Sequence, residues 1–194
     1  DMIAEEEVVL TITHQGYIKR TALNTYRTQR RGGRGVQGAM SKDEDFVEHL
    51  FIANTHNYML FFTDMGKCYW LKVYDIPQGG RATRGRAIVN LIGCSPGERV
   101  EAFVSVKEFD DQHYIVMSTR KGIVKKTVLS AYGKPRKGGI YAIDIREGDK
   151  LIQARITNGE HDILLGTHEG KSIRFSEGNI RASGRKTMGV KGIK

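Results

Sequence analysis

The sequence predicts an all-β fold assembled from propeller-like blades. One pattern, a β-branched or aromatic strand followed by Thr-x-x-Gly and a second strand, occurs four times, and its threonines are spaced by 50, 56 and 48 residues. No stretch of ten or more residues has the periodicity of an amphipathic helix. The chain has 23 glycines but 3 prolines, which favours tight turns over rigid linkers. A repeat of about 50 residues with about four strands is typical of propeller blades.

Each of the four repeats opens with a β-hairpin. Runs of β-branched and aromatic residues favour strands on both sides of the tip, and the tip glycine is expected to need a positive φ. The predicted strand pairs are 8–13 with 17–21, 58–63 with 67–71, 114–119 with 123–127, and 163–167 with 171–175. The tip glycines, predicted to be structural, are Gly16, Gly66, Gly122 and Gly170.

Two further strands follow the hairpin in the first three repeats, and one follows it in the fourth. About twenty residues after each tip threonine a glycine begins a short alternating strand, and these glycines are Gly35, Gly85, Gly139 and Gly189. A third element precedes the next hairpin and follows an acidic or glycine-containing turn; it covers residues 46–53, 99–106 and 150–157. The repeats are therefore placed at about 8–57, 58–113, 114–161 and 162–194, the last one incomplete, within a single domain or a fragment of one.

The fourth repeat stops before its trailing strand, which predicts an open sheet edge. One expectation is that the acidic residues 5–7 near the N-terminus supply a partner for this edge. The other is that the sequence is a fragment of a longer protein with more blades. Because an unpaired sheet edge promotes aggregation, the second expectation is favoured.

The composition predicts a folded protein with a polyanionic partner. Hydrophobic residues make up 39% of the 194 residues, which fits a globular chain. Lysine and arginine total 31 against 22 acidic residues, and the net charge of +9 favours nucleic acid, or less strongly an anionic membrane surface. No apolar run approaches the ~18 residues of a membrane span. There is no signal peptide either, so no membrane partner is expected and a cytoplasmic protein is predicted.

A basic, glycine-rich heptad at residues 29–35 is the first candidate site. Its arginines carry a permanent charge on a planar group that suits phosphate, and its glycines let the backbone approach a ligand closely. The alternative interpretation is a solvated basic turn. The predicted DNA-binding residues of this heptad are Gln29, Arg30, Arg31, Gly32, Gly33, Arg34 and Gly35.

Basic residues also lead into the equivalent glycine of each later repeat. Repeated units place equivalent positions on equivalent faces, so these residues are expected to form a curved band of positive charge. Such a band suits duplex DNA bent by phosphate contacts, at a cost of roughly 1–6 kcal/mol for 20–30 base pairs. No helix is predicted that could read the major groove. The predicted contacts are Arg81, Arg84, Arg86, Lys134, Arg136, Lys137, Arg181, Arg185 and Lys186.

The heptad Gln-Arg-Arg-Gly-Gly-Arg-Gly closely resembles the GyrA box of the C-terminal domain in the DNA gyrase A family, and the segments 80–86 and from Gly189 resemble that domain's blades. The resemblance covers essentially the whole chain. It implies a β-pinwheel, a propeller-like disc whose blades exchange strands, here with about four visible four-stranded blades. It also implies that double-stranded DNA wraps around the disc with positive handedness, which lets ATP-driven strand passage introduce negative supercoils.

The resemblance implies a non-catalytic segment of a type II topoisomerase. The implied partners are the gyrase B subunit, together with the remainder of the gyrase A subunit, in an A2B2 holoenzyme of the bacterial cytoplasm and nucleoid. The cleavage tyrosine, ATP and Mg²⁺ belong elsewhere in that holoenzyme, so no cofactor is expected here. Cys68 and Cys94 form no CxxC pair and have no histidine cluster nearby, so we expect reduced, packed thiols and no metal site.

Three alternatives remain beside the gyrase interpretation. The first is the corresponding C-terminal domain of topoisomerase IV, although that family generally has a degenerate heptad. The second is a propeller that binds acidic protein partners, and the third, a free-standing enzyme, has no residue constellation to support it.

Two smaller questions are also open. The aromatic cluster 61–62 and 69–70 is expected in the core instead of stacking on bases. Lys125 and Lys126 are expected to face outward from a strand, with or without DNA contact.

Overall fold

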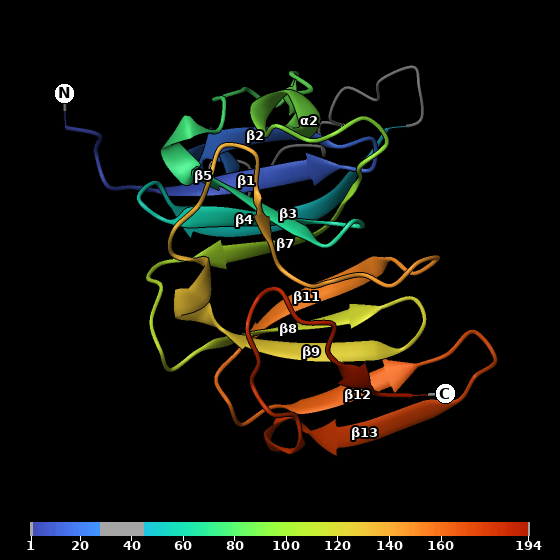
Figure 1. Ribbon diagram of the computed structural model, residues 1–194. Coiled ribbons are helices and arrows are strands. Elements are labelled where there is room, and N and C mark those ends of the chain that lie inside the picture. The colour runs from blue at the N-terminus through green and yellow to red at the C-terminus, as the bar shows by residue number, and fades with distance from the viewer. Residues whose placement is uncertain (1, 28–44, 194) are drawn as a thin grey trace. The chain divides into compact units, whose positions relative to one another are not determined.

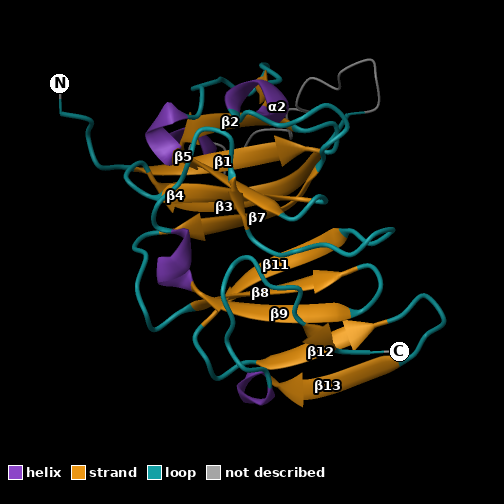
Figure 2. Ribbon diagram, viewed as in Figure 1, coloured by secondary structure: helices purple, strands orange, loops and turns teal. Residues whose placement is uncertain are grey.

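The structure is a computed structural model that describes residues 2–27 and 45–193 (Figure 1). Residues 1, 28–44 and 194 lie outside the described part. Strands dominate this part, and its helices are short (Figure 2). The all-β fold predicted from the hairpin repeat is confirmed.

Fourteen strands form in the described chain, and the predicted strand ends agree with them to within one residue for every hairpin and every third element. The strands are β1 (Glu7–Thr13), β2 (Tyr17–Ala22), β3 (Val47–Asn54), β4 (Tyr58–Thr63), β5 (Lys67–Lys72), β6 (Arg86–Ala87), β7 (Val100–Val106), β8 (Tyr114–Thr119), β9 (Ile123–Val128), β10 (Ile140–Tyr141), β11 (Leu151–Thr157), β12 (Asp162–Gly166), β13 (Ser172–Ser176) and β14 (Val190–Lys191). The helical turns are α1 (Leu23–Arg27), α2 (Ile88–Leu91), η2 (Val73–Asp75), η3 (Leu129–Tyr132) and η4 (Glu177–Asn179). These turns are too short to leave a helical period in the sequence.

Strand exchange between consecutive repeats defines the sheets. The sheet orders are β3-β1-β2-β6, β10-β5-β4-β7, β11-β8-β9-β14 and β12-β13. In each of the first three, a hairpin has the third strand of its own repeat on one side and a two-residue strand of the next repeat on the other. The exchange implied by the pinwheel resemblance is therefore confirmed. The fourth sheet holds its hairpin alone among the described residues.

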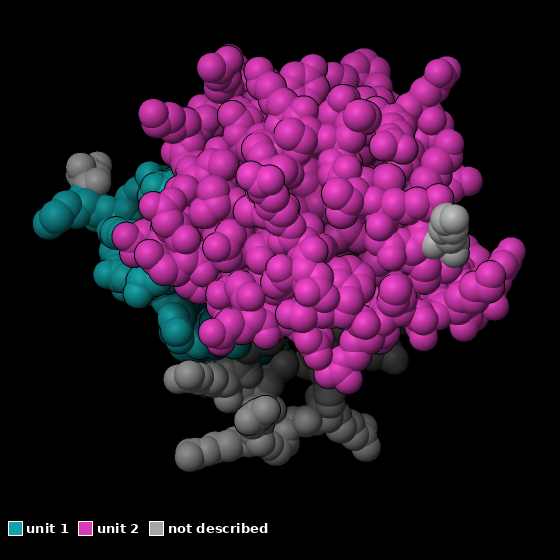
Figure 3. Space-filling model, turned by 60° about the horizontal axis from the view of Figure 1, so that its bottom comes forward, with its two compact units in different colours: residues 1–59, 71–93, 105–107 teal, residues 60–70, 94–104, 108–194 magenta. Residues whose placement is uncertain are grey.

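The described chain forms two compact units, which Figure 3 colours separately. The first contains residues 1–59, 71–93 and 105–107, and the second contains residues 60–70, 94–104 and 108–194. Each unit holds at least one of the basic loops that the sequence singles out.

The predicted aromatic core is confirmed for three of its four residues. Phe61 and Phe62 are fully buried, and Tyr69 is also buried, whereas Trp70 is only half-buried. The rings of Phe62 and Tyr132 pack edge to face with centroids 5.8 Å apart, which is a favourable geometry for aromatic pairs. Both cysteines are free thiols, one buried and the other half-buried, as expected.

The repeated Thr-x-x-Gly motif is explained by the hydrogen bonds of the hairpin tip. In all four tips the threonine Oγ1 accepts the backbone N–H of the fourth residue after it, over 3.1–3.3 Å. The glycine N–H donates to the carbonyl of the same threonine, and the glycine takes φ between 81° and 86°. This positive φ is the conformation for which the sequence needs glycine.

An acidic residue ahead of the third strand ties that strand to the tip. Glu98 accepts a 2.8 Å bond from the Thr63 hydroxyl, and Asp149 accepts the N–H of Lys121 at 2.9 Å. Burial alone would raise the pKa of Asp149, but bonds from Thr119 and from the backbone outweigh it and lower the pKa. The acidic turns found in the sequence are therefore structural.

The acidic lead-in, the segment of residues 2–6 before β1, forms hydrogen bonds within the first compact unit. The hydroxyl of Thr55 donates to the carbonyl of Ala4 at 2.8 Å, and the N–H of Glu6 donates to the Thr55 hydroxyl at 3.1 Å. Asn54 also donates to the Glu5 carboxylate at 3.1 Å. The lead-in is thus held by the turn between β3 and β4.

Candidate nucleic-acid interface

The basic heptad lies outside the described residues. Gln29 to Gly35 therefore remain a sequence prediction, and the described part of the candidate interface consists of the three later basic loops. Each of these loops leads to a glycine with positive φ (Gly85, Gly139 and Gly189, at 90°, 77° and 83°) that stands immediately before β6, β10 or β14. The loops are called loop A (residues 79–86), loop B (residues 133–139) and loop C (residues 181–189), and loop A is taken to include Arg86, the first residue of β6.

Loop A is shaped by a tight turn and by close contact with β2. The N–H and the hydroxyl of Thr83 both donate to the carbonyl of Gly80, at 3.2 and 2.9 Å. A Cβ at Gly85 would overlap the carbonyl of Ile18, so only glycine allows the loop to lie this close to the strand.

A buried lysine supports loop A from below. The ammonium group of Lys19, on β2, donates to the carbonyls of Gly80, Arg81 and Thr83 over 2.9, 3.3 and 2.8 Å. The side chain is buried, and burial lowers its pKa. This one side chain therefore bonds the backbone of the loop to the preceding repeat at three points.

The three predicted cations of loop A differ in their surroundings. Arg86 is exposed, and Arg81 is half-buried and donates to the carbonyl of Thr25. Arg84 stacks on the ring of Tyr17 at 3.8 Å and bonds to Asp45 at 3.3 Å, and it donates to the side chain of Gln15 as well. The sequence predicts that Arg84 contacts DNA. In the structure its guanidinium group already has partners within the protein.

Loop C repeats the design of loop A. The hydroxyl of Thr187 donates to the carbonyl of Gly184 at 2.9 Å, which is the same turn as in loop A. The ammonium group of Lys125, on β9, donates to the carbonyls of Arg185 and Ala142, both at 2.6 Å.

The cations of loop C are again of two kinds. Arg185 is half-buried and donates to the carbonyl of Tyr141 at 2.9 Å. Arg181 and Lys186 are exposed, and within the described chain neither makes a side-chain bond. These two side chains are therefore available to a ligand.

Loop B has three exposed cations, and a tyrosine instead of a lysine lies beneath it. Lys134, Arg136 and Lys137 are all exposed, and no side-chain partner of theirs occurs in residues 2–27 and 45–193. Tyr69 takes the place beneath this loop that lysine takes beneath the other two, and a Cβ on Gly139 would come within 2.8 Å of its ring. The phenol group of this tyrosine is held by Glu98 over 2.7 Å.

The expectation that Lys125 and Lys126 face outward is wrong. They are 1% and 6% exposed, and the ammonium group of Lys126 lies 3.3 Å from the carboxylate of Glu177, which is fully buried. A strand with one solvent-facing side would expose one of two adjacent lysines, but β9 is covered on both faces. Sequence reasoning also missed Lys19. The signal that could have found it is that Lys19 and Lys125 are both the third residue after a tip glycine.

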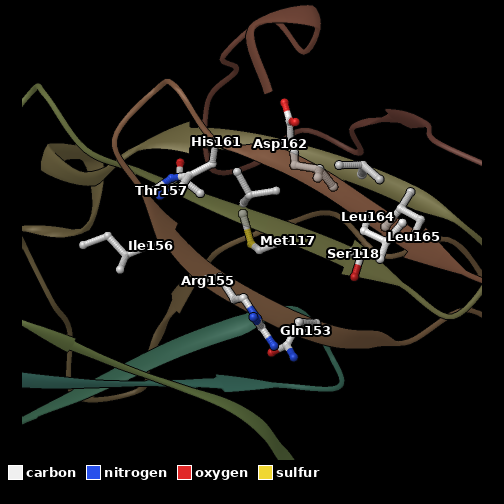
Figure 4. Close-up of a pocket in the computed structure, with 13 residues that line it drawn as sticks. Met117, Ser118, Gln153, Arg155, Ile156, Thr157, His161, Asp162, Leu164 and Leu165 are labelled. Carbon is white, nitrogen blue, oxygen red and sulfur yellow. The ribbon is translucent and has the colours of Figure 1, made fainter. Parts of the chain in front are cut away.

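A separate pocket lies between β8, β11 and β12 (Figure 4). Its lining is mostly apolar, and Figure 4 places Met117 between an end with Thr157 and His161 and an end with Leu164 and Leu165. It contains none of the predicted basic residues, so it is not part of the proposed interface.

No group of three or more His, Cys, Asp or Glu side chains is placed to hold a metal ion in the part of the chain that the structure describes. None of the described helices is long and apolar enough to cross a membrane.

Comparison with known proteins identifies the family. The family described as "DNA gyrase C-terminal domain, beta-propeller" matches residues 7–54, 57–107, 113–158 and 161–194. The chain belongs to this family. The DNA gyrase A protein of Clostridium acetobutylicum is 50% identical to it over 99% of the chain, and the chain spans only 23% of the length of that relative.

Solved structures of the gyrase C-terminal domain type share the fold. The C-terminal domain of DNA topoisomerase IV superposes with a TM-score of 0.83 at 29% identity, over 100% of this chain and 58% of that one. A DNA gyrase A C-terminal domain gives a TM-score of 0.72 at 24% identity, over 97% and 61%. The second likeness supports the fold alone. Both likenesses support the overall fold.

Proposed function

We propose that this gyrase-type domain binds double-stranded DNA without sequence specificity and wraps it along its basic loops. The observation that carries the proposal is the recurrence of a cation-bearing loop at the same place in successive repeats, immediately before each exchanged strand. Six of the nine predicted cations of these loops are exposed, and they are Arg86, Lys134, Arg136, Lys137, Arg181 and Lys186.

The chemistry of these loops suits the phosphate backbone. Lysine and arginine that neutralise phosphates release counterions, so binding should weaken steeply as salt rises. The helices of the described chain have three to five residues, too short for a recognition helix in the major groove. Contacts of this kind position DNA but carry no sequence information.

The wrapping is proposed to have positive handedness and to present DNA for negative supercoiling. In this proposal the heptad 29–35 fixes the DNA where the wrap begins or closes, and the other loops supply charge along its path. The domain would act within an A2B2 assembly, with the gyrase B protein and the rest of the gyrase A protein, in the bacterial cytoplasm. The cleavage tyrosine, ATP and Mg²⁺ would be used elsewhere in that assembly. The identity to gyrase A proteins supports this context.

The linking number of a closed plasmid tests the proposal. This chain is added to relaxed plasmid, the DNA is relaxed again with a nicking-closing enzyme, and the protein is removed before electrophoresis. Positive wrapping is expected to leave a positive shift in linking number that grows with the protein-to-DNA ratio. An unchanged linking number at stoichiometric protein would contradict wrapping.

The C-terminal domain of topoisomerase IV is the second candidate, because the solved domain of that enzyme superposes with a TM-score of 0.83. The intact heptad of this sequence and the 50% identity to a gyrase A protein favour gyrase. The full-length assembly separates the two. Gyrase should introduce negative supercoils into relaxed plasmid, whereas topoisomerase IV should unlink catenated circles without supercoiling them.

A further inference from the structure

Lys19 and Lys125 occupy the same structural position in different repeats. Each is the third residue after the tip glycine, on the second strand of a hairpin. Each side chain is buried, at 8% and 1% exposure, and reaches beneath the basic loop of the next repeat. Lys19 lies wholly within the first compact unit with loop A, and Lys125 lies within the second unit with loop C.

The partners of the two ammonium groups are unusual for buried lysines. Across the described residues, both bond to backbone carbonyls and neither forms a carboxylate ion pair. Burying an ammonium group without a counterion is costly, and burial lowers the pKa of Lys125 to about 8. An apolar side chain would fill the space more cheaply, so core packing does not explain a lysine here.

Four of the five bonded carbonyls lie in loops A and C, and the fifth is that of Ala142, just after β10. Lys19 holds the carbonyl of Arg81, and Lys125 holds the carbonyl of Arg185, which stands at the same distance from its loop's terminal glycine. In loop B this position is Pro135, whose ring restricts φ, and the residue beneath is Tyr69. The lysine is thus present under the two loops that have no proline to stiffen them.

We propose that Lys19 and Lys125 are positioning residues for DNA binding, which fix the backbone of loops A and C so that their exposed cations meet phosphates already ordered. This inference rests on the proposed DNA-binding function. It assigns the two lysines to the interface although neither touches DNA. Loops fixed in advance lose less freedom on binding, which is why preorganisation raises affinity.

The test compares Lys19→Met and Lys125→Met in the full-length protein with Lys126→Met. The control removes a buried ammonium from the adjacent residue of β9, on the opposite side of the strand, where it pairs with Glu177 instead of a basic loop. Lys125→Met is expected to reduce the slope of log K against log salt by about 1, which is roughly tenfold weaker binding in 0.1 M salt. Lys126→Met should keep the wild-type slope, and Lys125→Arg, which retains donors and charge, should recover most of the affinity.

Amide hydrogen exchange locates the effect and does not depend on DNA. Lys125→Met should speed exchange at the N–H of Asp144, which donates to the Thr187 carbonyl at 3.0 Å, while the β8–β9 ladder stays protected. Lys19→Met should do the same at the Thr83 N–H of loop A and leave loop C unchanged. Equal loss of DNA affinity in the Lys125→Met and Lys126→Met variants would overturn the inference, because it would reflect stability alone.

A third variant separates failure of this inference from failure of the proposed function. Changing Lys134, Arg136 and Lys137 to glutamine removes exposed charge and leaves both buried lysines in place. If this triple variant weakens DNA binding but the Lys→Met variants of loops A and C do not, the positioning role is wrong and the DNA-binding function stands. If neither set changes binding, the proposed function itself is contradicted.

Discussion

Lys125 lies almost completely buried on β9, with its ammonium group between two carbonyls. The pKa of Lys125 falls from 10.5 to about 8, chiefly because of burial; the Arg185 charge acts in the same direction and Asp144 opposes the shift. Between pH 8 and pH 10.5, Lys125 is protonated in the unfolded chain but has released its proton in the folded protein. The free energy of unfolding must therefore rise with pH across this window.

We expect the free energy of unfolding of the wild type, minus that of Lys125→Met, to grow as pH rises from 8 to 10.5. Urea denaturation at each pH measures this difference in the free energy of unfolding. The fluorescence of Trp70 monitors unfolding, because Trp70 is the single tryptophan of the chain and belongs to the same compact unit as Lys125. A difference that stays constant or shrinks with pH would mean that the ammonium group is not destabilised by burial.

Arg84 is a predicted DNA contact whose side chain also has partners within the protein. The sequence places it among the phosphate contacts, but in the structure its guanidinium stacks on Tyr17 and pairs with Asp45. The side chain of Asp45 is only 2% exposed, so removing its partner would leave a buried charge uncompensated. Arg84 is better understood as a link between loop A and the residue that precedes β3.

At the scale of elements, strand exchange depends on the glycine that ends each basic loop. Gly85 and Gly16 both have positive φ, at 90° and 85°, but they differ in surroundings. An added Cβ at Gly85 meets the carbonyl of Ile18 and the side chain of Lys19, whereas at Gly16 it meets nothing within 4 Å. Substitution at Gly16 therefore reports backbone strain alone, whereas substitution at Gly85 reports both backbone strain and the close approach of loop A to β2.

Gly16→Ala is expected to cost about 1–2 kcal/mol of stability, because a residue with a Cβ is strained in a left-handed backbone. Gly85→Ala should cost clearly more and should also release β6, which pairs with β2 through Tyr17 and Ile18. Thermal unfolding followed by circular dichroism gives the stabilities, and exchange of the β2 amides reports the pairing. Equal losses in both variants would show that close approach contributes nothing at loop A.

At the scale of the whole molecule, positive charge is shared between the two compact units. Loop A belongs to the first unit, and loops B and C belong to the second. The net charge of +9 favours association with a polyanion at low salt.

The heptad arginines provide the whole-molecule prediction. Replacing Arg30, Arg31 and Arg34 together with alanine should abolish the plasmid linking-number shift while binding to a short linear duplex falls much less. The reason is that closure of a wrap needs contacts at its end, whereas plain binding sums contacts along the path. The Lys134, Arg136 and Lys137 glutamine variant is the charge-matched control. Parallel loss of wrapping and binding in the alanine variant would reduce the heptad to ordinary surface charge.

The hairpins, the third strands and the places of the basic loops can be predicted from short stretches of residues. These features are local: a β-branched run, a threonine that bonds to the N–H of the fourth residue after it, and a glycine that takes positive φ are written within a few residues. The strand exchange needed more than this, and it came from the resemblance to the gyrase family, because pairing between repeats has no local signature.

Only the tertiary structure decided which cations face solvent. Lys19 and Lys125 look like outward-facing strand residues, yet the loop that covers each of them is contributed by a segment about 60 residues away in the sequence. Burial depends on such distant contacts, and so does the pairing of Arg84 with Asp45. The same physical reason explains both outcomes: residue type decides what a side chain can bond to, and the fold decides which of those partners comes within reach.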